Sequence, residues 1–147
     1  MRISWEQYAL DIAEVAATRS EDPYLKVGAV ILRPDNSVAS IGYNGGPAGI
    51  DLQWHDREGR RKYVIHAEAN AFRYVKLNEV KDGLIAVTHR PCQTCLPQIA
   101  AYGIKNVYYK YEIDNDTYPV ELLDNIANEL QLNVKCLKGE DNAKNYI

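Results

Sequence analysis

The stretches His66-Ala67-Glu68 and Pro91-Cys92-Gln93-Thr94-Cys95 decide the fold, because each places metal-binding side chains at the start of an expected helix. The first stretch begins a helix expected over residues 66–77, and the second begins one over 92–102. A spacing of three residues puts the two cysteines on one face of a helix start. The positive end of the helix dipole lowers the pKa of thiols at that position and favours the thiolates that bind metal.

His66, Cys92 and Cys95 together predict a zinc site with three protein ligands. Three ligands leave the fourth position of the metal for water, which is the arrangement of a catalytic site and not of a closed structural one. Zinc lowers the pKa of that water toward neutrality. Glu68 follows His66 by two residues, and at the first turn of a helix both side chains can reach the space in front of the helix end. The sequence therefore predicts one catalytic zinc ion per chain, with Glu68 as the residue that moves protons.

Strand and helix patterns on either side of these stretches predict an α/β fold with a central mixed sheet of about five strands. After a first hairpin the strands and helices alternate, which is typical of an α/β layered fold with a largely parallel sheet. A first helix opens at Ser4 and carries an apolar stripe that includes Trp5 and Tyr8. The expected strands cover 27–32, 38–43, 84–88, 105–111 and 132–137, a further helix covers 119–130, and a polar stretch follows the Gly-rich loop 44–49.

Composition limits the kinds of protein this chain can be. A length of 147 residues, with 46% hydrophobic and 25% charged residues, is typical of one globular domain, expected over 1–147 with a polar tail over 138–147. A net charge of −3 argues against a polynucleotide partner, which usually requires a basic face. The apolar runs are too short to span a membrane, and no signal peptide precedes the first helix. We therefore expect a cytoplasmic protein.

The Cys-x-x-Cys spacing by itself leaves two other classes open. Thiol redox proteins share this spacing, and a non-catalytic zinc module could also use Cys92 and Cys95. The third cysteine, Cys136, lies in an apolar stretch and is interpreted as a small buried hydrophobe. His89 precedes the cysteine pair and is interpreted as a residue of the site's rim or scaffold.

Several segments of the chain resemble the deoxycytidylate (dCMP) deaminases, a family of the cytidine deaminase superfamily. The resemblance runs from about Trp5 to Val134, and the Gly-Tyr-Asn-Gly loop is its most discriminating part. It implies the three-layer α/β/α cytidine deaminase-like fold. The matching segments are Ser20-Glu21-Asp22-Pro23, Val27-Gly28-Ala29-Val30, Gly42-Tyr43-Asn44-Gly45-Gly46-Pro47, His66-Ala67-Glu68-Ala69-Asn70-Ala71 and Thr88-His89-Arg90-Pro91-Cys92-Gln93-Thr94-Cys95.

This resemblance implies hydrolysis of dCMP to dUMP and ammonia, with Glu68 protonating the cytosine ring and then the leaving amine. It also implies that Asn44 binds the sugar and that Ala67 belongs to the substrate site. Lys26 and Tyr111 are candidates for binding the phosphate.

The family also suggests regulation and assembly. Many of its members are hexamers that dCTP activates and dTTP inhibits, with Mg²⁺ accompanying the triphosphate. By this resemblance Gly42, Tyr43, Asn44 and Gly45 are candidates for the effector site, and the chain is expected to form a homo-oligomer. Cytidine and tRNA adenosine remain alternative substrates within the superfamily.

Overall fold

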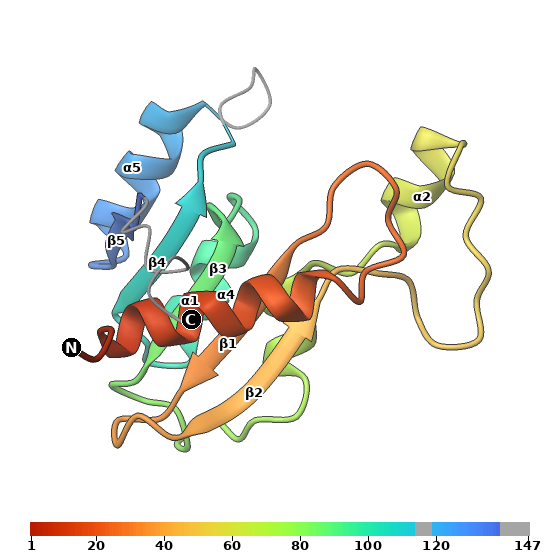
Figure 1. Cartoon of the computed structure of the whole chain (residues 1–147). Coiled ribbons are helices and arrows are strands. Elements are labelled where there is room, and N and C mark those ends of the chain that lie inside the picture. The colour runs from red at the N-terminus through yellow and green to blue at the C-terminus, as the bar shows by residue number, and fades with distance from the viewer. Residues whose placement is uncertain (114–118, 139–147) are drawn as a thin grey trace.

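The computed structural model describes residues 1–113 and 119–138 (Figure 1). Most of the expected tail therefore lies outside the described residues, and the single-domain organisation stays a prediction. No helix within the two described ranges has the length and apolar character needed to cross a membrane. The elements in chain order are α1 (Trp5–Ala17), β1 (Gly28–Leu32), β2 (Val38–Tyr43), α2 (Arg57–Tyr63), α3 (Ala67–Phe72), β3 (Leu84–His89), α4 (Cys95–Ala101), β4 (Asn106–Tyr111), α5 (Val120–Glu129) and β5 (Asn133–Cys136).

The five strands form one mixed sheet in the order β2-β1-β3-β4-β5, which confirms the expected sheet. Strand β1 runs antiparallel to both of its neighbours, with Ala29 opposite Gly42 of β2 and opposite Val87 of β3. Strands β3, β4 and β5 run parallel to one another. The sheet is thus less parallel than the alternation of elements suggested, because the returning arm of the first hairpin forms the sheet edge and leaves β1 between two strands of opposite direction.

Helices cover both faces of this sheet and make three layers. Helix α1 packs on one face, where Leu10 and Ala13 contact Val30 of β1. Helices α3, α4 and α5 pack on the other face, where residues such as Phe72 and Ile99 form the larger core. Figure 1 shows α1 lying across the front of the sheet and α2 standing away from it. All five residues of β1 are buried, as expected for a strand covered on both faces.

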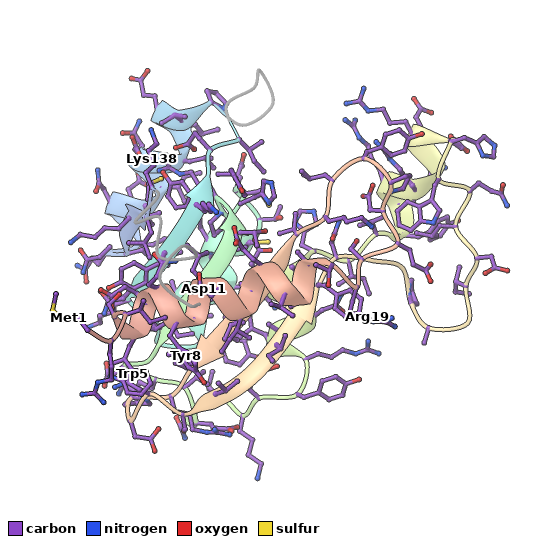
Figure 2. All side chains as sticks on the ribbon, viewed as in Figure 1. Met1, Trp5, Tyr8, Asp11, Arg19 and Lys138 are labelled. Carbon is purple, nitrogen blue, oxygen red and sulfur yellow. The ribbon has the colours of Figure 1, made fainter. Side chains whose placement is uncertain are left out.

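Helix α1 begins where the sequence predicts, because the Ser4 hydroxyl accepts a hydrogen bond from the Gln7 backbone N–H at 3.2 Å. Its apolar stripe is only partly buried. Trp5 and Tyr8 are 52% and 38% exposed, and their rings pack edge to face against each other near the N-terminal end of the helix (Figure 2). The helix instead buries Leu10 beside its small alanines, so the buried face is rotated relative to the expected one.

Two helix boundaries differ by three or more residues from the sequence-based expectation, and one helix was not expected. Helix α3 ends at Phe72, before the expected end at residue 77, and α4 starts at Cys95, three residues after the expected start. Helix α2 lies in the stretch that the sequence analysis left as polar loop. It buries no residue and so has no apolar periodicity, and the Asp56 carboxylate caps it by accepting from the Gly59 N–H at 3.1 Å.

Gly28 lies where α1 crosses β1, and we predict that this contact tolerates no side chain. A Cβ at Gly28 would lie 1.9 Å from the Ala13 carbonyl oxygen and 2.7 Å from the Ala17 nitrogen, both backbone atoms of α1. Gly28→Ala should lower the free energy of unfolding by about 1–3 kcal/mol or more, as measured by urea denaturation, because helix and strand must separate. Gly45→Ala is the matched control, since a Cβ there meets nothing within 4 Å. Equal stability of the two variants would contradict the packing argument.

Candidate metal centre and active site

Three side chains from two distant segments converge at the ends of α3 and α4. The His66 Nδ1 atom lies 3.3 Å from the Sγ atom of Cys92 and 3.3 Å from that of Cys95. The two sulfurs are 3.7 Å apart, and all three potential ligand atoms lie within 4.8 Å of one another. The structure therefore brings together all three residues that the sequence predicts as metal ligands.

The distances within this cluster fit a tetrahedral zinc ion. Zinc bonds of about 2.3 Å to sulfur and about 2.0 Å to nitrogen place two sulfurs about 3.8 Å apart, and nitrogen about 3.5 Å from each sulfur. The cluster's separations of 3.7 Å between sulfurs and 3.3 Å from nitrogen to sulfur are close to these values. The cysteines are buried whereas His66 is exposed, so a fourth position can face the surface. Two sulfurs and an imidazole also form the donor set that zinc prefers.

His66 occupies the N-cap position of α3 without a capping hydrogen bond from its side chain, and a backbone bridge next to it fixes its position. The neighbouring Ile65 exchanges two hydrogen bonds with Gly45, at 2.8 and 3.1 Å. Further along the helix, the Asn70 side chain donates to the Tyr43 carbonyl at 2.8 Å. The loop that follows β2 therefore holds both ends of the segment that carries the imidazole.

Cys92 lies in the turn that precedes α4, and not on the helix as predicted. Its carbonyl accepts hydrogen bonds from the N–H groups of Cys95 and Leu96 at 3.1 and 3.2 Å. Cys92 thus provides an acceptor for the first N–H groups of α4 although it precedes the helix. Its sulfur lies 3.1 Å from the Thr94 hydroxyl oxygen. Residues 93 and 94 form a turn. The two cysteines therefore do not share one face of a helix, as expected, because Cys92 precedes the turn and Cys95 begins the helix.

The electrostatics of the cluster favour one thiolate before any metal binds. Hydrogen bonds from Cys95 first, and then from His66 and Thr94, lower the pKa of Cys92 to about 3. The hydrogen bond to Cys92 and burial raise the pKa of Cys95 far above its ordinary value. Cys92 therefore favours the thiolate form that binds metal, whereas metal binding must displace the proton of Cys95. The hydrogen bond with Cys92 also raises the pKa of His66.

Glu68 lies two residues after His66, in the first turn of α3, and is only 4% exposed. Burial raises the pKa of its carboxyl, although the nearby imidazole of His66 opposes this. A buried carboxyl with a raised pKa keeps its proton closer to neutral pH than an ordinary glutamate does. Such a group beside a metal cluster can hold and transfer a proton.

Comparison with known proteins agrees with this geometry. The profile of the cytidine and deoxycytidylate deaminase zinc-binding region matches residues 3–111, a range that contains the whole cluster and Glu68. The chain belongs to this deaminase family. The match explains why a histidine, two cysteines and a buried glutamate occur together at two helix starts.

Individual members of the family match most of the chain. The deoxycytidylate deaminase of Mycobacterium phage D29 is 36% identical over 126 residues, which cover 76% of this chain and 98% of the phage protein. A Caenorhabditis elegans protein named probable deoxycytidylate deaminase is 37% identical over 109 residues, which cover 70% of this chain but only 55% of that protein. The crystal structure of the cyanophage S-TIM5 dCMP deaminase in complex with dCMP and dUMP superposes with a TM-score of 0.74 at 26% identity, covering 93% of this chain and 99% of the phage chain.

Asn44, one of the substrate-binding residues suggested by the family resemblance, is 6% exposed, and its side chain is used inside the protein. Its amide nitrogen donates to the Leu25 carbonyl at 2.9 Å, and its amide oxygen accepts from the Val27 N–H at 2.9 Å. Lys26 donates to the Ser20 carbonyl within the same loop. In this structure both side chains serve to hold the loop that connects α1 to β1.

Tyr111 and Ala67 are placed differently from these two residues. Tyr111 is 47% exposed at the end of β4, opposite His89 of β3, and the centroids of their two rings lie 5.1 Å apart. The side chain of Ala67 is fully buried in the core, so any substrate contact by this residue must involve its backbone.

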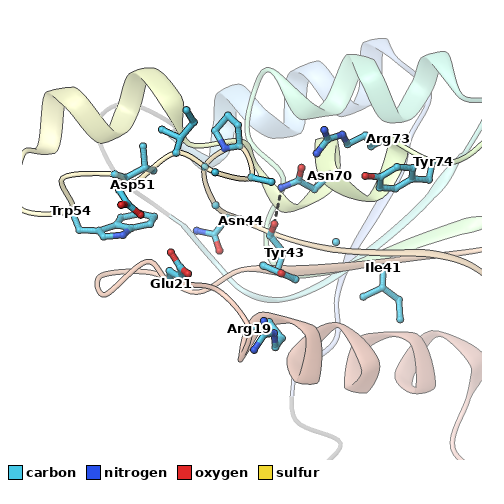
Figure 3. Close-up of a pocket in the computed structure, with 18 residues that line it drawn as sticks. Arg19, Glu21, Ile41, Tyr43, Asn44, Asp51, Trp54, Asn70, Arg73 and Tyr74 are labelled. Carbon is cyan, nitrogen blue, oxygen red and sulfur yellow. Dashed lines mark hydrogen bonds between the residues drawn. The ribbon is translucent and has the colours of Figure 1, made fainter.

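A cavity of about 460 Å³ is lined by all four residues of the Gly-Tyr-Asn-Gly loop (Figure 3). None of the three metal-ligand residues lines it. Its walls come from the end of α1, the loop after β2 and the C-terminal part of α3, with Arg19, Glu21, Asp51, Trp54, Asn70, Arg73 and Tyr74 among the lining residues. Sequence analysis identified the loop but missed Asn70, Arg73 and Tyr74, because only the fold brings α3 to this place.

The two cysteines of the cluster differ from Cys136 in a way that predicts metal content. Cys95→Ser should lose most bound zinc, because it removes one of two sulfur ligands. Cys136→Ser should keep zinc at the wild-type level, because Cys136 is a half-buried residue of the edge strand β5 whose sulfur donates to the Lys110 carbonyl at 3.4 Å. Among the described residues, the group of potential metal ligands does not include it. Elemental analysis of purified protein measures both. Full zinc retention by Cys95→Ser would show that the cluster is not the metal site.

Proposed function

We propose that this chain catalyses the hydrolytic deamination of dCMP to dUMP and ammonia. The observation that carries this proposal is the buried Glu68 beside a three-ligand cluster that leaves a fourth position toward the surface. Supporting it, a cyanophage relative with the same fold has been solved in complex with dCMP and dUMP. The phage D29 relative, of nearly the same extent, carries the name deoxycytidylate deaminase.

The proposed chemistry divides between metal and protein. Bound zinc supplies a Lewis acid that lets water act as a nucleophile near neutral pH. His66, Cys92 and Cys95 would hold the ion. Glu68 would take one proton from the attacking water and deliver it to N3 of the cytosine ring. It would then take the second proton, from the hydroxyl group now on C4, and deliver it to the amino group, which leaves as ammonia while the C4 carbonyl forms. Its raised pKa suits this cycle, because a carboxyl that keeps a proton near neutrality can also donate it.

The proposed substrate contacts follow from what the structure leaves accessible. Of the two phosphate candidates, Tyr111 is the better, because the ammonium group of Lys26 is already bound to the Ser20 carbonyl. The Asn44 amide already forms hydrogen bonds with the backbone of Leu25 and Val27, so it would bind the sugar only through its remaining donor or acceptor positions. Ala67 would contribute its backbone.

Replacing Glu68 with glutamine tests the proposed mechanism. Glu68→Gln keeps size and hydrogen bonding but cannot cycle a proton, so ammonia release from dCMP should fall by about 10²–10⁴-fold. Zinc content should stay at the wild-type level. Glu129→Gln, at the far end of α5, is the matched control and should behave as wild type.

The same assay separates the alternatives. Faster turnover of cytidine or of an RNA adenosine than of dCMP would overturn the assignment of substrate. Full activity of Glu68→Gln would overturn the assigned role. A non-catalytic zinc module would release no ammonia from dCMP, cytidine or the RNA adenosine. A thiol redox protein would instead form and break a disulfide between Cys92 and Cys95, whose sulfurs are 3.7 Å apart.

We also propose that the cavity at the Gly-Tyr-Asn-Gly loop binds a nucleotide triphosphate effector with Mg²⁺. Its volume of about 460 Å³ suits a ligand of nucleotide size. Arg19 and Arg73 supply cations for phosphates, while Glu21 and Asp51 supply oxygens for a metal ion. We also propose a homohexameric assembly and a cytoplasmic location for this protein.

Kinetic measurements test the effector proposal. The rate of dCMP deamination at low substrate should rise with dCTP and Mg²⁺ and fall with dTTP. Arg73→Ala should weaken this response, whereas Arg33→Ala should keep it, because Arg33 pairs with Glu79 and does not line the cavity. A rate that does not change with either triphosphate would contradict the proposal and leave the proposed reaction unaffected.

A further inference from the structure

Arg90 carries a buried charge that the proposed chemistry does not use. Only three charged residues are buried in the described part of the chain, namely Asp22, Glu68 and Arg90. The side chain of Arg90 is 5% exposed and forms ion pairs with Glu112, at 3.3 Å, and with Asp124 of α5. Because two carboxylates already pair with this guanidinium, it is not a spare cation for a substrate phosphate.

The contribution of these ion pairs to folding stability does not explain why an arginine is buried at position 90. Its partners are 33% and 56% exposed, so water screens each pair and could solvate both carboxylates if the arginine were absent. Burying the guanidinium removes it from water, a cost that the pairing offsets only in part. An apolar side chain of similar size could fill this space at comparable stability.

The position of Arg90 in the chain links it to the metal site. It is the first residue after β3 and lies two residues before Cys92. Its backbone N–H donates to the Tyr111 carbonyl at 2.9 Å. Its guanidinium also lies 5.4 Å from the centre of the Tyr109 ring, so backbone and side chain both attach the start of the Cys92 turn to β4.

Two segments carry the metal ligands: the His66 arm, which contains Ile65 and His66, and the Cys92 arm, which runs from Arg90 to Cys92. These two arms are held by contacts with different parts of the sheet. The His66 arm is bound by backbone pairing between Ile65 and Gly45, next to the edge strand β2. The Cys92 arm has the side chain of Arg90 as its anchor toward β4 and α5. Pro91, between Arg90 and Cys92, has no N–H to donate and restricts the chain, so a shift of Arg90 is transmitted to the sulfur.

We propose that Arg90 is a positioning residue for Cys92. It fixes the turn that holds this sulfur against β4 and α5, and so sets the geometry and affinity of the zinc site. Only the kinetic consequence rests on the proposed deaminase function, whereas the metal-binding consequence does not.

Arg90→Met tests this proposal, with Arg33→Met as the matched control. Arg33 also forms an ion pair between distant segments, with Glu79, but lies away from the metal site. Zinc affinity is measured by competition with a chromophoric chelator, and the geometry of the site by the ligand-field and sulfur-to-metal charge-transfer bands of the cobalt-substituted protein. Arg90→Met should bind zinc about 10- to 100-fold more weakly and change the cobalt spectrum. Arg33→Met should match the wild type in both.

Urea denaturation of the metal-free variants separates positioning from general destabilisation. The two variants should have similar free energies of unfolding, although only one loses zinc affinity. The proposal would be overturned if Arg90→Met had the same zinc affinity and cobalt spectrum as Arg33→Met. It would also be overturned if both variants lost zinc affinity in proportion to their loss of folding stability. If Arg90→Met does not fold, Arg90→Lys decides, because it keeps the charge but loses the planar fork. Wild-type zinc affinity and spectrum in Arg90→Lys would then overturn the proposal.

In the zinc-loaded protein, Arg90→Met should lower kcat for dCMP while KM stays within a few-fold of wild type. A scaffold residue that acted only on stability would leave both constants unchanged in the folded, fully loaded variant. Absence of dCMP turnover in the wild type would instead count against the proposed function, and the metal measurements would still decide the role of Arg90.

Discussion

The whole structure depends on holding an imidazole and two sulfurs within a few ångströms of each other, although 26 residues separate His66 from Cys92. The sheet makes this possible. Strand β3 lies inside the sheet between β1 and β4, and its carboxyl end leads into the turn with both sulfurs. Helix α3 packs against β1 and β2, which brings its N-terminus to the same place. Each of the two segments is fixed by its own long-range contacts, which together bring the ligand atoms close to one another.

The sequence predicts those features of the fold and the candidate site that depend on neighbouring residues, and it fails for those that depend on contacts in the folded chain. The convergence of His66, Cys92 and Cys95, the buried β1 and the α1 cap were predicted correctly. The motifs, the hydrophobicity and the capping pattern behind these predictions are local properties of the sequence. Local patterns did not place Cys92 before α4. The turn that precedes α4 and a first helical turn beginning at Cys92 share the same local hydrogen bonds, from the Cys95 and Leu96 N–H groups to the Cys92 carbonyl. Local patterns also missed α2, whose residues have no buried face to produce a periodic signal.

The residues around the site show the same limit. The resemblance to a family directed attention to Asn44, yet the loop that occupies its amide group becomes visible only in three dimensions. The sequence places Arg90 beside the metal turn but gives no hint of its partners, Glu112 and Asp124, which lie 22 and 34 residues further along the chain. Sequence reasoning thus found the groups that do chemistry more readily than the groups that hold them.

The short helix α3 connects the metal cluster to the wall of the cavity. Its six residues span about 9 Å, with His66 at the N-cap position of one end and Asn70, near the other end, lining the cavity. Because one short helix carries both positions, a displacement that moved this helix as a whole would move Asn70 and the His66 backbone together. A cavity ligand that favoured such a displacement would change the affinity for metal, and by thermodynamic reciprocity metal binding would change the affinity for that ligand by the same factor.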